Sequence, residues 1–103
     1  MLRVELPNKL AGETKLVPFD FTSLLASGET ISTKSCAAAV YSGTDATPSA
    51  IISGSASSSG AVVSQAVTAG TVGVIYYIVC TITTSLSQTL QLAGFLAVLP
   101  DVP

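Results

Sequence analysis

Few side chains in this sequence could carry out acid–base or nucleophilic chemistry. The chain has no histidine, which excludes Ser–His–Asp triads and histidine general bases. Three carboxylates, those of Asp20, Glu29 and Asp45, lie in or beside expected turns, and their spacing indicates no shared acid–base site. Because carboxylates favour turns through local hydrogen bonds, we expect solvated turn or capping groups here and no enzyme.

The two cysteines, Cys36 and Cys80, are the remaining reactive groups. Two cysteines without a histidine cannot make an ordinary zinc site, so we expect neither a metal nor another cofactor. If the cysteines lay on facing sheets they could bridge a β-sandwich. The first residues show no secretory signal, so we expect no export and favour two reduced, buried thiols, with a disulfide left open.

The element around which the chain is organised is the β-branched and aromatic stretch from Gly70 to Thr84. Side chains alternate between the two faces of a strand, so one set suits a core: Val74, Tyr76, Ile78, Cys80 and Ile82. The other set is apolar only in its first half: Ile75, Tyr77, Val79, Thr81 and Thr83. The apolar run Val72–Cys80 is well short of the roughly 20 residues of a membrane helix, so we expect a strand and no membrane span.

Other stretches rich in apolar or β-branched residues, separated by Gly, Ser, Asp and Pro, are also expected to be strands. They are residues 16–21, 30–40, 50–55, 61–67 and 89–99. Six or seven strands with short turns predict an all-β protein, an antiparallel β-sandwich. In the last strand Phe95 and Leu99 are large apolar residues on the face that should point outward.

Charge is scarce and unevenly placed. Charged residues make up 10% of the chain, against about 25% in a usual domain. None occurs from Ala46 to Pro100, which favours a surface covered by neighbouring subunits over a Ser/Thr-solvated surface or a membrane contact. With a net charge of −2 and no basic patch, we expect no nucleic-acid binding.

The first 15 residues differ from the rest of the chain. They carry half of all the charges, including Arg3 and Lys9, and contain Pro7, Asn8 and Gly12, which break regular elements. We expect an N-terminal arm or edge segment over residues 1–15 and one domain over residues 16–103. The arm is either a frayed terminus or a tether that becomes ordered on a partner.

Two motifs lie in order along the chain. The first is Phe19-Asp20-Phe21-Thr22-Ser23-Leu24-Leu25 with Gly28-Glu29-Thr30-Ile31. The second is Gly70-Thr71-Val72-Gly73 with Tyr76, Ile78 and Thr81-Ile82-Thr83-Thr84. In order and separation they resemble the small bacteriophage fibre–tail adaptors. The resemblance covers Leu16 to Leu99, but the family's usual second-strand tryptophan is missing near Cys36, and Ser87-Gln88-Thr89 stands where the family usually has Gly-Arg and acidic residues.

The resemblance implies an immunoglobulin-like β-sandwich that is a structural part of a virion. Tyr76 matches the family tyrosine, whose hydroxyl is expected to bond nearby backbone, with plain core packing as the alternative. The implied partners are other tail, neck or fibre subunits and copies of the chain itself, packed in a symmetric ring after synthesis in the host cytoplasm. A capsid decoration protein and an immunoglobulin-like surface- or carbohydrate-binding module are the alternatives.

Binding geometry alone is then the expected mechanism, with sandwich faces or edge strands packed on neighbours and the N-terminal arm clasping an adjacent subunit. The residues that we expect to bind partners are Phe95, Leu99, Tyr77, Arg3 and Lys9.

Overall fold

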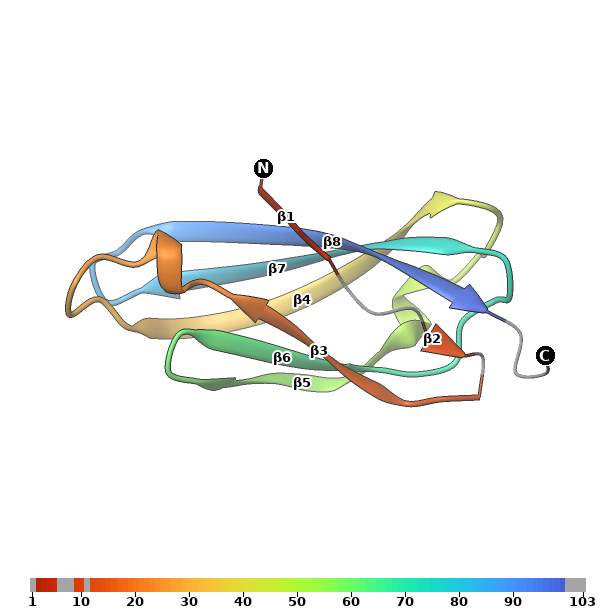
Figure 1. Ribbon diagram of the computed structural model, residues 1–103, viewed down its shortest axis with the longest axis horizontal. Helices are drawn as coiled ribbons and strands as arrows, with labels where there is room; N and C mark the ends of the chain where they lie inside the picture. Colours follow the sequence, from red (N-terminus) through yellow and green to blue (C-terminus); the bar gives the residue numbers. More distant parts are fainter. Residues whose placement is uncertain (1, 6–8, 11, 100–103) are drawn as a thin grey trace.

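The computed structural model describes residues 2–5, 9–10 and 12–99, and in them the chain forms two β-sheets packed face to face (Figure 1). The strands are β1 (Leu2–Glu5), β2 (Lys9–Leu10), β3 (Lys15–Asp20), β4 (Ile31–Ser42), β5 (Ile52–Ser59), β6 (Val62–Val67), β7 (Ile75–Thr84) and β8 (Thr89–Leu99). Two short 3-10 helices, η1 (Thr22–Leu24) and η2 (Pro48–Ile51), complete the described elements. The predicted all-β sandwich is confirmed, and all six predicted strands are present.

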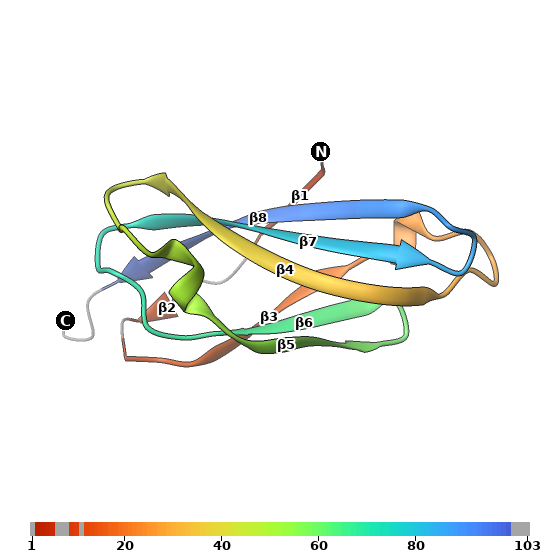
Figure 2. The same ribbon diagram turned by 180° about the vertical axis from the view of Figure 1, so that it is seen from behind.

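One sheet has the order β1-β8-β7-β4, with β2 also paired to β8, and the other has the order β3-β6-β5. Figure 2 shows the two layers from behind, with β4, β7 and β8 in one and β3, β5 and β6 in the other. Strand β7 lies between β4 and β8 and pairs antiparallel with both. The stretch that dominates the sequence is therefore central to its sheet.

The core lies between the two sheets, against the predicted inner face of β7. Its members on that strand and just before it are all buried: Val74, Tyr76, Ile78, Cys80 and Ile82. The opposite sheet contributes Val17 and Phe19 from β3, and Phe21 follows that strand into the same core. Leu24 and Leu25, which follow Phe21 in the chain, are partly buried and pack against the core.

The N-terminal strands β1 and β2 lie along the edge of β8 that faces away from β7. Strand β1 pairs parallel with Leu92–Phe95, and β2 pairs parallel with Val98 and Leu99. The sequence predicted an arm or an edge segment here, but not the parallel pairing, so the sheet is mixed at this side rather than purely antiparallel. In this structure β1 and β2 therefore widen the larger sheet of their own chain.

The largest difference from the predicted elements lies around β5. We expected a strand over residues 50–55 and a loop over Ser57–Gly60, but the strand runs through the serines to Ser59. The register of its pairing with β6 shifts between Ser53 and Ser57. A bulge there accommodates the extra residues of β5. In the described part of the chain, no helix is long and apolar enough to cross a membrane.

Candidate partner-binding face

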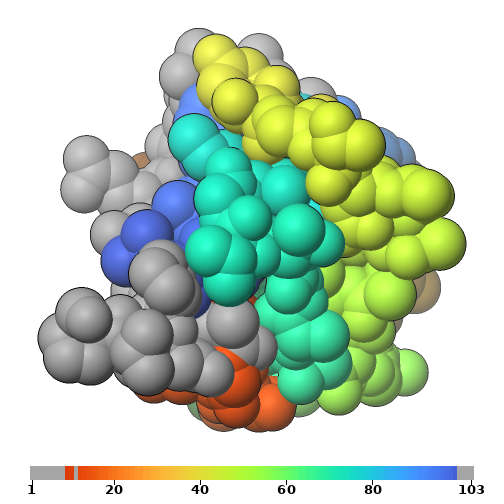
Figure 3. Space-filling model, turned by 90° about the vertical axis from the view of Figure 1, so that its right-hand side faces the viewer, coloured from red at the N-terminus to blue at the C-terminus, as the bar shows by residue number. Residues whose placement is uncertain are grey.

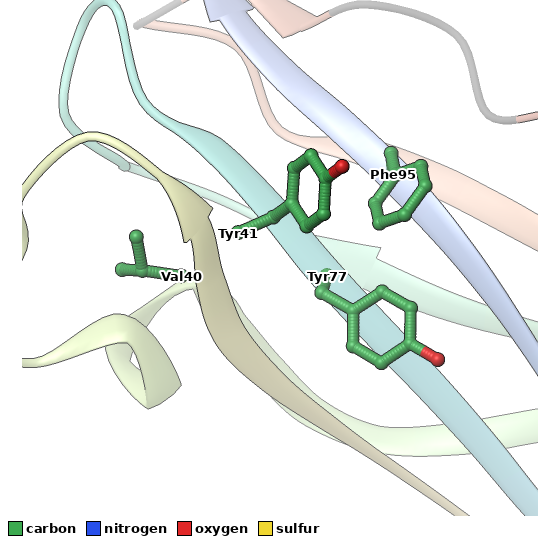
Figure 4. A pocket seen from close by; sticks show the side chains of 4 residues that line it. All are labelled: Val40, Tyr41, Tyr77 and Phe95. Carbon is green, nitrogen blue, oxygen red and sulfur yellow. The ribbon is translucent and has the colours of Figure 1, made fainter.

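Three aromatic side chains from three neighbouring strands meet on the outer face of the larger sheet. The Phe95 ring of β8 lies 5.3 Å from the Tyr77 ring of β7 and 4.4 Å from the Tyr41 ring of β4, measured between ring centroids. Figure 4 shows Tyr41 reaching across β7 toward Phe95. The tilted contacts are of the kind that aromatic pairs prefer, so the three rings form one cluster, the aromatic face.

Strand register explains why these side chains meet. Tyr77 and Phe95 are direct partners across β7 and β8, and Ala39 of β4 is opposite Tyr77. Two residues after Ala39, Tyr41 lies at a register shift between Val40 and Ser42, where the strand bends. The sequence predicts Tyr77 and Phe95 as partner-binding residues but not Tyr41, because alternation in β4 is too weak to indicate which residues face outward.

The aromatic face is open, and its three side chains carry no charge, although the backbone of Glu5 in β1 is the register partner of Phe95. Tyr41 is 64% exposed, whereas Tyr77 and Phe95 are half-buried beside it. An open hollow of about 280 Å³ is lined by Val40, Tyr41, Tyr77 and Phe95. The sequences of β7 and β8 contain no charged residue. Exposed aromatic surface without charge is the composition found at the centres of protein interfaces.

The other residues expected to bind partners are placed differently. Leu99 is half-exposed at the end of β8, on the same side of the strand as Phe95. The backbone of Arg3 belongs to β1, but its side chain lies outside the described part of the structure. Lys9 is fully buried, and its ammonium group donates hydrogen bonds to the carbonyl oxygens of Leu10 (2.8 Å) and Ala69 (2.6 Å). In this conformation Lys9 attaches β2 to the turn before β7.

On the inner face of β7, Tyr76 connects two loops at one end of the sandwich. Its hydroxyl accepts a hydrogen bond from the Thr71 backbone N–H (2.8 Å) and donates one to Asp45 Oδ2 (2.6 Å). Asp45 also accepts from the Thr47 N–H (2.9 Å). Figure 3 looks onto this end, where the loop after β4 (yellow) and the turn before β7 (teal) lie together. The expected bond from the Tyr76 hydroxyl to nearby backbone is confirmed.

Burial and the hydrogen bond to Asp45 together raise the pKa of Tyr76, so the phenol stays neutral. The same bond, with that from Thr47, lowers the pKa of Asp45.

The turn before β7 lies close to β8, which explains why the second motif has a glycine at position 70. A Cβ on Gly70, which has a φ of +98°, would lie 2.9 Å from a Val98 methyl carbon.

The other two carboxylates also make local hydrogen bonds. Asp20 is exposed and accepts bonds from the Thr22 hydroxyl and N–H, which lower its pKa. Glu29 was expected to be solvated but is buried. It accepts bonds from the Thr84 hydroxyl and the Ala26 N–H, and these lower its pKa. Each carboxylate therefore fixes a turn, and no group of three His, Cys, Asp or Glu side chains among the described residues could hold a metal ion.

The cysteines lie in one sheet rather than on facing sheets. Cys36 of β4 is directly opposite Cys80 of β7, and both thiols are free, as favoured from the sequence. The neighbouring thiol lowers the pKa of Cys36, and the neighbouring thiol together with burial raises that of Cys80. Cys80 is fully buried and Cys36 half-buried, so the pair lies at the margin of the core.

Comparison with known proteins gives one family. Residues 9–96 match the model of the family described as podophage GP4 fiber-tail adaptor protein gp77. No curated protein and no solved structure matches the chain significantly. The matched range covers most of the chain and includes Tyr41, Tyr77 and Phe95 of the aromatic face and the turn around Tyr76. The chain therefore belongs to the podophage fiber-tail adaptor family, a family of structural virion adaptors.

Proposed function

We propose that this protein joins the tail or neck of a podophage virion to its fibres by packing in a symmetric ring, with the aromatic face as its main contact. The family supports the adaptor role. The observation that carries the rest is the exposed cluster of Tyr41, Tyr77 and Phe95, which an isolated domain leaves in water. Its function in this proposal is binding geometry, with no chemical step.

The contact has an apolar centre and few charges. The Phe95 ring contacts both tyrosine rings, so a partner would meet a packed cluster rather than separate flexible side chains. Leu99 lies further along the same side of β8 and extends this surface toward the end of the strand. Lys9 is not part of the proposed contact, because its ammonium group is bonded inside the chain.

A ring fits a contact of this kind for a geometric reason. When a surface patch on each subunit packs against a different patch on the next one, the rotation between subunits either closes into a ring or continues as a filament. Residues 46–100 contain no charged residue, so in this proposal the second, complementary patch is also uncharged.

The test is the substitution Phe95→Glu, assayed by incorporation into virions when the variant complements a phage that lacks the gene. A carboxylate at the centre of an apolar contact would be buried without a partner, so we expect incorporation to fall at least about tenfold. The matched control is Leu16→Glu, since Leu16 of β3 is 67% exposed but lies on the other sheet. Both variants should show the circular dichroism spectrum of the parent.

Normal incorporation of the Phe95→Glu variant would overturn the proposed contact face. Quantitative mass spectrometry of purified virions tests the ring separately. A handful or a dozen copies per particle supports a ring, hundreds of copies indicate head decoration instead, and absence from virions contradicts the adaptor role for this chain.

A further inference from the structure

The cysteine pair has a geometry that the adaptor role does not use. Cys36 and Cys80 are register partners in the middle of the β4–β7 ladder, and the register is unbroken from Thr33 to Val40. Directly opposite residues in antiparallel strands have Cα atoms about 4.5 or 5.5 Å apart, depending on the type of pair. A disulfide needs roughly 4.4–6.8 Å, so either type of pair brings the two cysteines within range.

The orientation of the side chains is also suitable. Both thiols point to the same side of the sheet, since Cys36 packs against the core cluster to which Cys80 belongs. Moreover, none of the described strands pairs with β4 on the side away from β7, and Cys36 is half-buried, so part of its surface is open to a small reagent.

The geometry points to a modification site: Cys36 and Cys80 form an intrachain, cross-strand disulfide when the folded protein meets a low-molecular-weight disulfide. The Cys36 thiolate attacks one sulfur of the reagent and releases a first small thiolate. Cys80 then loses its proton and attacks the Cys36 sulfur of the mixed disulfide, which releases the second small thiolate. The two cysteines lose two electrons, the reagent gains them, and the two thiol protons end on the two small thiols.

The bond would attach the outermost long strand of this sheet to its central strand. It would also close a long loop in the unfolded chain, which restricts the denatured state and stabilises the folded one. Disulfides persist on virions but are rare in a reducing cytoplasm. This pair therefore suits a subunit that folds with free thiols and is oxidised after release, a timing that rests on the proposed virion location, although the chemistry itself does not.

The test uses the full chain, purified with a reducing agent that is then removed, and incubated folded with oxidised glutathione at about pH 8, near the pKa of ordinary thiols. After quenching in acid, the protein is unfolded, alkylated and mapped by mass spectrometry. Pepsin is the suitable protease, because no lysine or arginine follows Lys34 and trypsin would leave both cysteines in one peptide. Pepsin also works in acid, where thiol–disulfide exchange is slow.

We expect the parent to lose both alkylatable thiols, to stay monomeric, and to give a peptide pair joined through Cys36 and Cys80. Its urea midpoint should rise on oxidation and return when the reducing agent is added. The Cys80→Ala variant should stop at a glutathione adduct on Cys36, and Cys36→Ala should keep its buried thiol unmodified, with no change of midpoint in either. The inference is wrong if both parent thiols remain alkylatable or if only disulfide-linked dimers and glutathione adducts form.

Discussion

Tyr76 and Tyr77 are consecutive residues of β7 that lie on opposite faces of one sheet, and their surroundings differ in every respect. The Tyr76 side chain is fully buried, and its hydroxyl has an N–H donor on one side and a carboxylate acceptor on the other. Tyr77 is half-buried, and its ring rests on Phe95 at the edge of an open hollow. The same residue type therefore stabilises the fold at one position and shapes a surface at the next.

The comparison separates residues that the fold needs from residues that a partner would need. A buried phenol must satisfy its hydroxyl within the protein, and Tyr76 does so through two loops that are distant in sequence. An aromatic cluster on the surface has no such requirement. Burying it against a partner would contribute favourably to the free energy of binding. Substitutions at the two tyrosines should accordingly affect different measurements.

The largest effect on stability is expected from Tyr76→Ala. Removing a fully buried aromatic side chain leaves a cavity and ends the bonds to Thr71 and Asp45, so the free energy of unfolding should fall by about 3–5 kcal/mol. Tyr77→Ala, its control on the opposite face, removes one partly exposed ring contact and should cost about 1 kcal/mol. Urea denaturation of both variants measures the difference, and equal losses would contradict the separation of the faces.

Removing only the hydroxyl group of either tyrosine should have a smaller effect on stability. Tyr76→Phe keeps the ring but removes the hydrogen bonds that the phenol makes with the Thr71 N–H and Asp45 Oδ2, at a cost of about 1–2 kcal/mol in the free energy of unfolding. Tyr77→Phe should change stability by less than about 0.5 kcal/mol, the range of ordinary surface substitutions. Should Tyr76→Phe be as stable as the parent, the connection between the two loops would have no energetic weight.

The smallest expected effect is on the pH dependence. Hydrogen bonds lower the pKa values of Glu29 and Asp45 in the folded state, so the unfolded chain binds protons more readily than the folded one in mild acid. Their contribution to stability is present above the unfolded pKa values, near 4.5 and 3.8, and is lost as the pH falls through the folded ones. The urea midpoint should fall between pH 5 and pH 3, and less steeply in Glu29→Gln. An unchanged slope in that variant would exclude Glu29 as a contributor.

The strands and their faces follow from the sequence to a large extent. Period-2 alternation over residues 74–82 identifies the inner face of β7 without error, and the last strand has the predicted bounds Thr89–Leu99. Alternation is a local property, and burial on one face imposes it strongly, so it can be read from one sequence. The outward position of Phe95 follows from the same rule, whereas its place beside Tyr77 depends on the register of β7 and β8.

The features that the sequence did not indicate depend on contacts between distant segments. Asp45 lies 31 residues before Tyr76, and no spacing rule connects them. Tyr41 joins the aromatic face through a register shift in a strand with weak alternation. The cysteines were weighed as a bridge between facing sheets, but strand order places them side by side in one sheet. Pairing partners and register come from tertiary packing, which local patterns leave open.

The strands that border the larger sheet have a consequence for aggregation. A long, flat, uncharged border strand invites other chains to add to the sheet, and a chain with so few charges is poorly protected by repulsion. On one side, the four residues of β1 and the two of β2 lie beside the eleven of β8, so in the described part of the chain this border consists of short segments. On the other side, Lys34 of β4 is exposed opposite the buried Ile82, and its ammonium group would lose water if another strand docked there. Both borders therefore discourage uncontrolled growth of the sheet and leave its outer face as the surface suited to ordered packing.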